Sequence, residues 1–292
     1  MLKQQFEIEI EGNNGIYKYE LEIEHAGYRP LVRISHEKLT FNQNSLLEFK
    51  QGNAQLYHDD HTPGPEYPFD WSRSALASLP SRHDNTKLTW FKKWIEKIIL
   101  VQINPVLMKS ESNQISNTLD FQCANFVDWY KKISENQGNI IEITNTLKEV
   151  INGFQYFHFE PTGENQVMLK VQISNHQYRF HELSLGQRAL IILYTLIHYA
   201  QNQGCTLCID EPENFVSLPE IQPWIFEVKD FCADGKMQAV LISHHPEYIN
   251  DLAESAGIWF ERNPDFPVRI RKINHEGELA LSELVARGWI NE

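Results

Sequence analysis

Two short apolar runs in the last third of the chain, each ending in polar residues, constrain the fold most strongly. Cys205–Ile209 is followed by Asp210-Glu211, and Ala239–Ile242 is followed by Ser243-His244. Pro219–Phe231, between them, has apolar residues at helical spacing. Strand, helix and strand with polar strand ends are typical of a parallel α/β unit, in which ligand groups gather at the carboxyl ends of the strands. The sequence therefore predicts an α/β fold with its candidate chemistry at these ends.

The beginning of the chain shows a different pattern, in which apolar and polar residues alternate. Phe6–Glu11 and Tyr17–Glu24 alternate strictly, and Asn13-Asn14-Gly15 between them is a turn signal. This pattern predicts an antiparallel hairpin with one solvated face. Leu31–Ile34 and Leu46–Phe49 are expected to be further strands of the same sheet.

The middle of the chain alternates between helical and extended patterns. The stretch 58–71 contains three prolines and is predicted to be a loop. Leu88–Val101 begins with a helical pattern and ends in an extended run. Further helices are predicted at Leu119–Ile133 and Ile140–Val150, and strands at Gln155–Phe159, Val167–Val171 and Tyr178–Leu183.

Composition excludes several classes of protein. The chain of 292 residues carries 26 Lys and Arg against 39 Asp and Glu, a net charge of −13, which disfavours nonspecific coating of nucleic acid. No apolar run reaches about 18 residues and no signal-peptide core follows Met1, so a cytoplasmic protein without membrane contact is expected. Cys205 and Cys208 lie in an apolar run without a second pair of metal ligands, which favours a structural role.

Three elements carry candidate chemistry, and each has a structural alternative. Of Asp210 and Glu211, one carboxylate can orient Mg²⁺ through its water shell while the other polarises an attacking water, as phosphoryl transfer requires; two solvated loop acids are the alternative. Leu183–Gln187, before an apolar helix, offers a capping serine, a glycine and free amides for an anion, or an ordinary capped helix. His244 can reach a phosphate oxygen, or simply pack.

The order and spacing of these elements resemble the C-terminal half of an ABC-type ATPase head of the RecF, SMC and OLD-nuclease group. The resemblance is to stand-alone bacterial AAA-type ATPases, in which a Leu-Ser-x-Gly-Gln signature, an Asp-Glu-Pro-Glu-Asn Walker B end and a Thr-His-Ser-Pro-Glu switch occur in this order. Here they correspond to Leu183–Gln187, Asp210–Asn214 and Ser243–Glu247. The resemblance implies Mg²⁺ and ATP as cofactors.

Residue by residue, the resemblance implies roles for the candidate residues. Asp210 would serve Mg²⁺ through water, Glu211 would be the catalytic carboxylate, and His244 would be the switch histidine, although His245 stands where the family has serine and leaves open which imidazole points inward. Gln102 is similar to the glutamine that senses Mg²⁺ between lobes. The signature residues that would contact the γ-phosphate of ATP held by the opposite subunit are Ser184, Gly186 and Gln187.

The P-loop that should hold the triphosphate is missing from this sequence. None of the 14 glycines begins the pattern Gly-x-x-x-x-Gly-Lys-Ser/Thr, whose amides, lysine and hydroxyl neutralise the β- and γ-phosphates. In the family this loop precedes the hairpin that here begins at Phe6, so an N-terminally incomplete head is expected. Truncation, a split gene and a degenerate ATPase are the explanations, with truncation favoured because the other motifs are intact. The chain alone is predicted neither to bind ATP tightly nor to hydrolyse it.

The resemblance implies a P-loop NTPase-like α/β fold with a mixed sheet core, an antiparallel hairpin region and a helical signature lobe. Residues 1–103 would be the remnant of the N-terminal core lobe, 104–182 the helical lobe with connecting strands, and 183–292 the C-terminal core. A head-to-tail dimer or a P-loop-bearing partner is expected, acting on DNA or on an effector protein. The alternatives are a non-catalytic scaffold that presents its signature surface to a partner, and a DNA-binding module without nucleotide.

Overall fold

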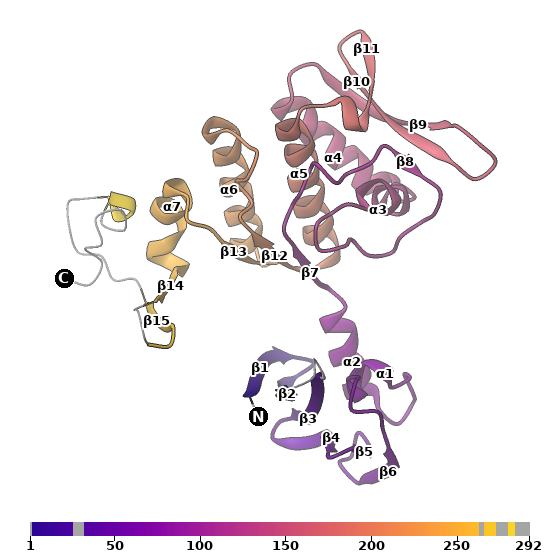
Figure 1. The fold of residues 1–292 in the computed structure, drawn as a ribbon, viewed down its shortest axis with the longest axis vertical. Helices are drawn as coiled ribbons and strands as arrows, with labels where there is room; N and C mark the ends of the chain where they lie inside the picture. Colours follow the sequence, from indigo (N-terminus) through magenta and orange to yellow (C-terminus); the bar gives the residue numbers. More distant parts are fainter. Residues whose placement is uncertain (1, 26–31, 263–265, 273–279, 284–292) are drawn as a thin grey trace. The chain divides into compact units, whose positions relative to one another are not determined.

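The computed structural model describes residues 2–25, 32–262, 266–272 and 280–283. The chain forms two compact units, Met1–Lys97 and Ile98–Glu292 (Figure 1). The observed boundary precedes residue 103, and the finer division into three parts stays a prediction. Together the two units make a mixed α/β protein with antiparallel and parallel sheets.

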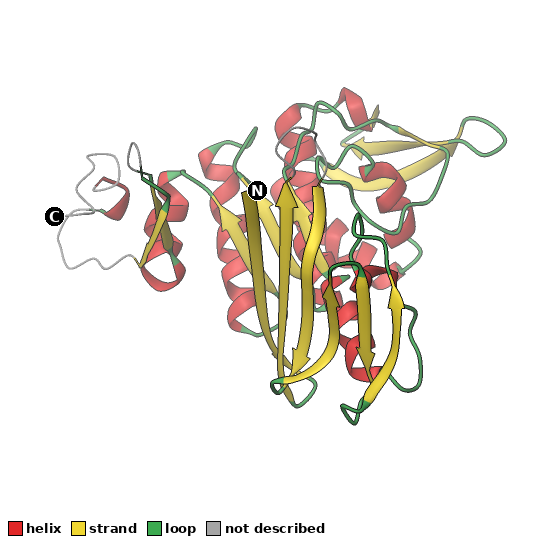
Figure 2. Ribbon diagram, turned by 60° about the horizontal axis from the view of Figure 1, so that its bottom comes forward, coloured by secondary structure: helices red, strands yellow, loops and turns green. Residues whose placement is uncertain are grey.

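The first unit is built on a six-stranded antiparallel sheet, which Figure 2 shows as adjacent yellow arrows. Its strands follow one another in chain order: β1 (Leu2–Gly12), β2 (Gly15–His25), β3 (Val32–Phe41), β4 (Asn44–Lys50), β5 (Asn53–Tyr57) and β6 (Pro63–Pro68). The predicted hairpin is confirmed, with Phe6 opposite Leu21 and the turn at Asn13 and Asn14 in left-handed backbone. The predicted loop 58–71 is partly wrong, because β6 lies within it; as the last strand of the sheet, β6 tolerates prolines.

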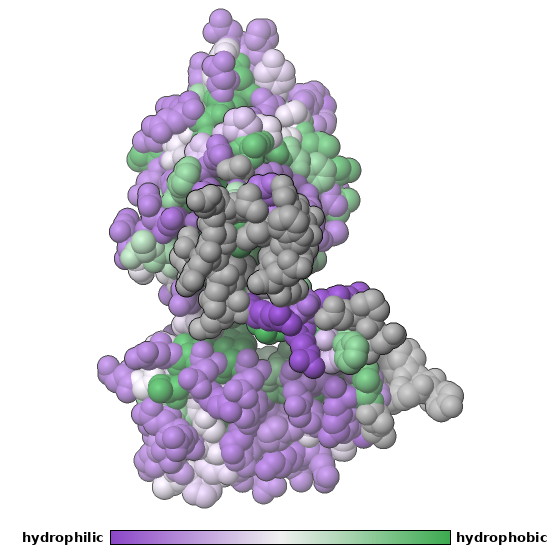
Figure 3. Space-filling model, turned by 90° about the vertical axis from the view of Figure 1, so that its left-hand side faces the viewer, coloured by the Kyte–Doolittle hydropathy of each residue, from purple (hydrophilic) through white to green (hydrophobic). Residues whose placement is uncertain are grey.

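The core of this unit lies between the sheet and two helices, α1 (Ala75–Ser78) and α2 (Thr86–Ile95). Tyr17 is fully buried and stacks on Trp90 at 4.9 Å between ring centroids. The opposite face carries alternating charged residues, and the surface of this unit in Figure 3 is largely hydrophilic. The alternation corresponds to a buried face only near the hairpin turn, where Ile10 and Tyr17 are buried, whereas Phe6, farther along β1, is 50% exposed.

The second unit contains the predicted parallel sheet. Its strands are β7 (Ile98–Val101), β12 (Thr206–Asp210) and β13 (Gln238–Ile242), in the order β13-β12-β7. Helix α6 (Leu218–Ala233) connects β12 to β13, which confirms the strand-helix-strand prediction. Helix α5 (Leu185–Gln203) precedes β12 and is buried on nearly all sides, as its apolar sequence predicts, and it ends at Gly204 in left-handed backbone.

The remainder of this unit is helical and antiparallel. It comprises β8 (Glu111–Ser112), α3 (Phe126–Ile133), α4 (Gln137–Val150), β9 (Phe154–Pro161), β10 (Val167–Ile173), β11 (His176–Arg179), the 3₁₀ turn η1 (Phe180–Glu182), α7 (Pro246–Ala256), β14 (Ile258–Glu261) and β15 (Arg269–Lys272). Strand β10 pairs with β8, β9 and β11, and β14 pairs with β15. The last predicted strand, Tyr178–Leu183, is only partly right, because η1 takes its second half.

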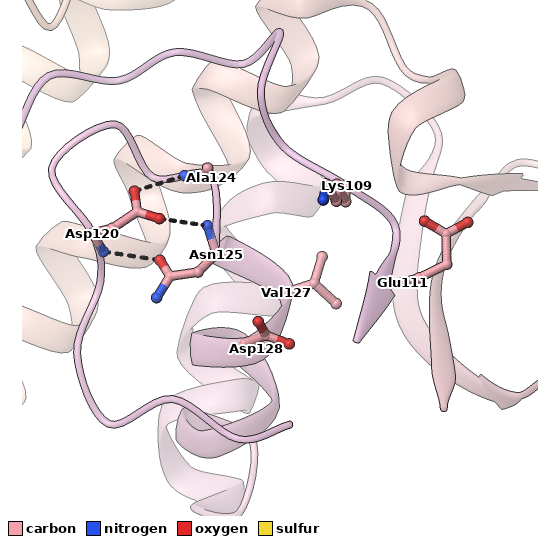
Figure 4. A pocket seen from close by; sticks show the side chains of 7 residues that line it. All are labelled: Lys109, Glu111, Asp120, Ala124, Asn125, Val127 and Asp128. Atoms are coloured by element: carbon pink, nitrogen blue, oxygen red, sulfur yellow. Dashed lines mark hydrogen bonds between the residues drawn. The ribbon is translucent and has the colours of Figure 1, made fainter. Parts of the chain in front are cut away.

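The helix predicted from Leu119 begins only at Phe126. The Asp120 carboxylate accepts the backbone N–H groups of Ala124 and Asn125 at 2.9 and 3.0 Å, closing a turn where a helix was expected (Figure 4). Side chains of this type compete with helical hydrogen bonds. Among the described residues, no helix combines the length and apolar character needed to cross a membrane.

Candidate active site

Three neighbouring parallel strands end in polar residues at one edge of the sheet in the second unit. Gln102 follows β7, Asp210 ends β12, and Ser243 follows β13. The Gln102 side-chain amide donates to Asp210 Oδ2 over 3.1 Å. Beyond the last paired residues, the Glu211 N–H donates to the Ile242 carbonyl over 2.8 Å. The sheet therefore brings the sequence-predicted residues of all three strands to one edge.

Glu211 lies at the centre of this edge. Its Oε1 is 3.3 Å from His244 Nδ1, and its Oε2 accepts a hydrogen bond of 2.8 Å from the Asn214 side-chain amide. The Glu211 backbone has φ of 49°, in the left-handed region that residues with side chains usually avoid. Strained backbone of this kind clusters at functional sites. The turn after β12 therefore directs the carboxylate toward His244.

Of the two adjacent histidines, His244 is the one beside Glu211. The His245 backbone N–H donates to Ser243 Oγ over 3.0 Å, and its ring lies edge-on to Tyr248 with centroids 6.2 Å apart. The His244 side chain is 81% exposed, so few neighbours restrict it beyond Glu211. The sequence left this choice open; the structure places the exposed His244 against Glu211, and its role as the switch histidine stays a prediction.

Glu213 also belongs to this edge, although the sequence assigned it no role of its own. Ser243 Oγ donates to Glu213 Oε1 over 2.6 Å, across 30 positions of sequence. Glu213 is 8% exposed, which is unusual for a glutamate. The motif letters Asp-Glu-Pro-Glu-Asn contain it, but its contact with Ser243 depends on the register of β12 and β13.

The start of α5 lies against the same turn. A Cβ at Gly186 would lie 2.9 Å from the Phe215 carbonyl oxygen, so only glycine allows this approach. Ser184 and Gln187 form a capping box, in which Ser184 Oγ accepts the Gln187 N–H and Gln187 Oε1 accepts the Ser184 N–H, both at 3.1 Å. Within this chain both side chains cap the helix, and their contact with a nucleotide on another subunit stays a prediction.

The edge offers oxygen ligands rather than a closed metal cage. Asp210 and Gln102 carry the hard oxygen atoms that suit Mg²⁺, which keeps several waters and needs few protein ligands. No cluster of three or more His, Cys, Asp or Glu placed to hold a metal occurs in the described part of the chain. The oxygen atoms of Asp210 and Gln102 would fit an ion held through its water shell.

A hollow lies elsewhere in the second unit. It has a volume of about 210 Å³, and Figure 4 shows the residues that line it, among them Lys109, Glu111, Asp120 and Asp128. Asp120 and Asn125 satisfy each other and their own loop by hydrogen bonds. These contacts explain Asp120 and Asn125 as loop structure, whereas Asp128 Oδ1 is buried without a hydrogen-bond partner among the described residues. The sheet edge, where three strands bring polar residues together, is the stronger candidate.

Comparisons with known proteins add little. No protein-family model matches the chain, and no curated protein matches it. Three solved structures are similar to parts of the chain. An SMC ATPase from work on ATP-driven dimerization and DNA-stimulated activation matches 56% of this chain and 97% of its own, at 10% identity and a TM-score of 0.38. The Smc head domain with coiled coil and joint from Pyrococcus yayanosii matches 57% of this chain and 33% of its own (12% identity, TM-score 0.38), and the SmcHead bound to the C-winged helix domain of ScpA matches 88% and 75% (8% identity, TM-score 0.42). Likeness at this level assigns neither a family nor a function.

Proposed function

We propose that this chain is an ATP-binding and ATP-hydrolysing domain of the ABC type, similar to RecF, SMC and OLD heads, that needs a P-loop from outside the 292-residue sequence, as a truncated or a split form would. One observation carries the proposal. The Glu211–His244 contact of 3.3 Å lies at the same strand edge as the Gln102–Asp210 hydrogen bond of 3.1 Å. An acid that activates water beside an acid that serves a metal ion is what phosphoryl transfer requires.

Each residue of the edge has a distinct task in this proposal. Glu211 orients the attacking water and accepts its proton, and Asn214 holds the second carboxylate oxygen so that Oε1 faces the reaction. His244 donates a hydrogen bond toward a phosphate oxygen. Asp210 and Gln102 would hold the water shell of Mg²⁺, which neutralises phosphate charge when bound.

The proposal includes association of two subunits. Ser184, Gly186 and Gln187 open α5, where free amides and the helix dipole favour an anion. In a head-to-tail dimer, this helix start would meet the γ-phosphate held by the other subunit. DNA or an effector protein would respond to that closure.

ATP binding to the isolated chain is the first test. Each charge-assisted hydrogen bond to a phosphate contributes about 1.5–3 kcal/mol, so a chain without a P-loop should bind ATP weaker by several kcal/mol than a complete head. A titration with a fluorescent ATP analogue and Mg²⁺ should give no micromolar affinity and no hydrolysis. Micromolar binding by the chain alone would contradict the dependence on a P-loop from outside this sequence.

The second test adds a P-loop. A P-loop-bearing segment, either joined to this chain or added as a separate polypeptide, should restore hydrolysis, measured as phosphate release. Glu211→Gln should then abolish turnover while ATP stays bound, because the amide cannot accept the proton. Glu164→Gln, an exposed change in the loop between β9 and β10, is the matched control and should leave turnover unaltered.

A non-catalytic scaffold is the second candidate, favoured by the absence of the P-loop pattern from the 292-residue sequence. A scaffold should assemble with its partner equally well with Glu211 or with Gln at that position. Hydrolysis by the pair that survives Glu211→Gln would therefore favour the scaffold and refute catalysis here. Salt-dependent DNA binding without ATP would instead support a nucleic-acid module.

A further inference from the structure

Glu213 connects the turn after β12 to both neighbours of His244. Its Oε1 accepts the Ser243 hydroxyl at 2.6 Å, and Ser243 Oγ accepts the His245 backbone N–H at 3.0 Å. His244 lies between these two anchored residues in the chain. Because the His244 side chain is 81% exposed, the backbone on either side does more to place its ring than packing does.

A carboxylate suits this connection better than an amide. An ionised carboxylate only accepts hydrogen bonds, so the Ser243 hydroxyl must donate to it. The lone pairs of Ser243 Oγ are then left to accept the His245 N–H, as observed. A glutamine at this position would offer an N–H₂ group as well as an oxygen and would no longer fix the direction of the hydroxyl.

Two buried polar atoms beside this connection lack partners. Glu213 Oε2 and the hydroxyl of Tyr248, on α7, have no hydrogen-bond partner among the described residues. Burial raises the pKa of Tyr248, and the charge of Glu213 adds to the rise, so the phenol keeps its proton and lies within electrostatic reach of the carboxylate. Native cores rarely leave such groups unsatisfied, and the exceptions call for a specific explanation.

We infer that Glu213 is a positioning residue that holds the His244 imidazole against the Glu211 carboxylate. It does so through Ser243 and the His245 backbone, without touching substrate. The chemical purpose of this contact rests on the proposed ATPase function, but the contact itself exists without nucleotide. It can therefore be tested in the chain alone.

Histidine NMR of the full chain measures the contact. The reporter is the shift of the His244 Cε1–Hε1 resonance caused by Glu211→Gln, with the resonance assigned by its loss in His244→Gln. This response should be present in the natural sequence and lost when Glu213→Gln or Ser243→Ala is added. Ser243→Thr keeps the hydroxyl and should retain the response, as should Glu164→Gln, the exposed control.

The outcomes separate this inference from the proposed function. An undiminished His244 response in Glu213→Gln overturns the positioning role.

Glu213→Gln could unfold the second unit, which far-ultraviolet circular dichroism would reveal. The comparison of Ser243→Ala with Ser243→Thr then decides: equal His244 responses overturn the inference, and loss of the response only in Ser243→Ala supports it. In the protein completed by a P-loop, Glu213→Gln should lower kcat for ATP with KM unchanged. If the His244 response depends on Glu213 but hydrolysis survives Glu211→Gln, the proposed ATPase function is wrong and the positioning role is still supported.

Discussion

Each unit buries a glutamate, but the two carboxylates differ in how many hydrogen bonds they accept. Glu37, fully buried in the first unit, accepts hydrogen bonds from the Tyr19 hydroxyl at 2.8 Å, the Ser74 hydroxyl at 2.6 Å and the Ala75 N–H at 2.7 Å. Glu213, in the second unit, accepts one from Ser243 and leaves its second oxygen without a partner in the described residues. A saturated carboxylate ties a strand to a helix start and serves the fold. A carboxylate with an oxygen that has no partner can still accept a hydrogen bond, which a functional site can use.

The largest expected effect on this comparison comes from Glu37→Ala. Removing the carboxylate leaves two partly buried hydroxyls and the buried N–H groups of Ala75 and Leu76 without this acceptor, and breaking such a group typically costs about 3–5 kcal/mol. The free energy of unfolding, measured by urea titration, should fall by that amount. Glu9→Ala, an exposed change on β1, is the control and should stay within about 0.5 kcal/mol of the natural sequence. Equal losses in both variants would show that the Glu37 hydrogen bonds do not support the fold.

Glu227 on α6 is a third, partly buried glutamate, and its titration should make the stability of the protein depend on pH. Burial raises the pKa of this carboxyl to about 7 from 4.5, with the charges of Glu149 and Asp230 adding to the rise. A carboxyl that holds its proton more tightly when folded contributes stability that is complete below pH 4.5 and is lost as the pH rises through about 7. The loss should be about 2–3 kcal/mol.

Glu227→Gln removes this dependence. Between pH 4.5 and pH 8, the free energy of unfolding should fall by about 2–3 kcal/mol less in Glu227→Gln than in the natural protein. In the control Glu164→Gln it should fall by the same amount as in the natural protein. His198, whose Nε2 is 3.5 Å from Glu227 Oε1, has its pKa lowered from its ordinary value by burial, which favours the neutral imidazole. A constant difference between variant and natural protein across the interval would contradict the shifted carboxyl.

The smallest effect should come from Glu213→Ala. One charge-assisted hydrogen bond is lost, but an unpaired buried oxygen is also removed, so the unfolding free energy should fall by only about 1–2 kcal/mol. The measurement is the same urea titration as for Glu37→Ala. A loss as large as that of Glu37→Ala would mean that Glu213 serves the fold, and the contrast between the units would disappear.

The sequence predicted the elements whose patterns are local. The hairpin of β1 and β2 alternates residue by residue, and α5 is apolar on nearly every side, so both were predicted correctly. The sequence predictions were wrong where one side chain, or a position at the edge of a sheet, changed the local structure that the pattern indicates. Asp120 closes a turn in place of a helical start, and β6 accepts prolines because it ends its sheet.

The candidate site was predicted at the level of strands but not of contacts. Asp210, Glu211 and His244 were expected together because parallel strands end at one edge, and the register of β12 with β13 brings them there. The contact between Ser243 and Glu213 was not predicted, since it depends on the turn between β12 and α6. The choice of His244 over His245 likewise required the direction of each ring.

The backbone of Glu211 has a consequence for efforts to make this unit more robust. With φ of 49°, the position would accept glycine with less conformational strain than any residue bearing a side chain. A screen for thermal tolerance alone would tend to favour Glu211→Gly, since many natural sites exchange stability for activity. Such a variant would be sturdier and would have discarded the acid on which turnover is proposed to depend.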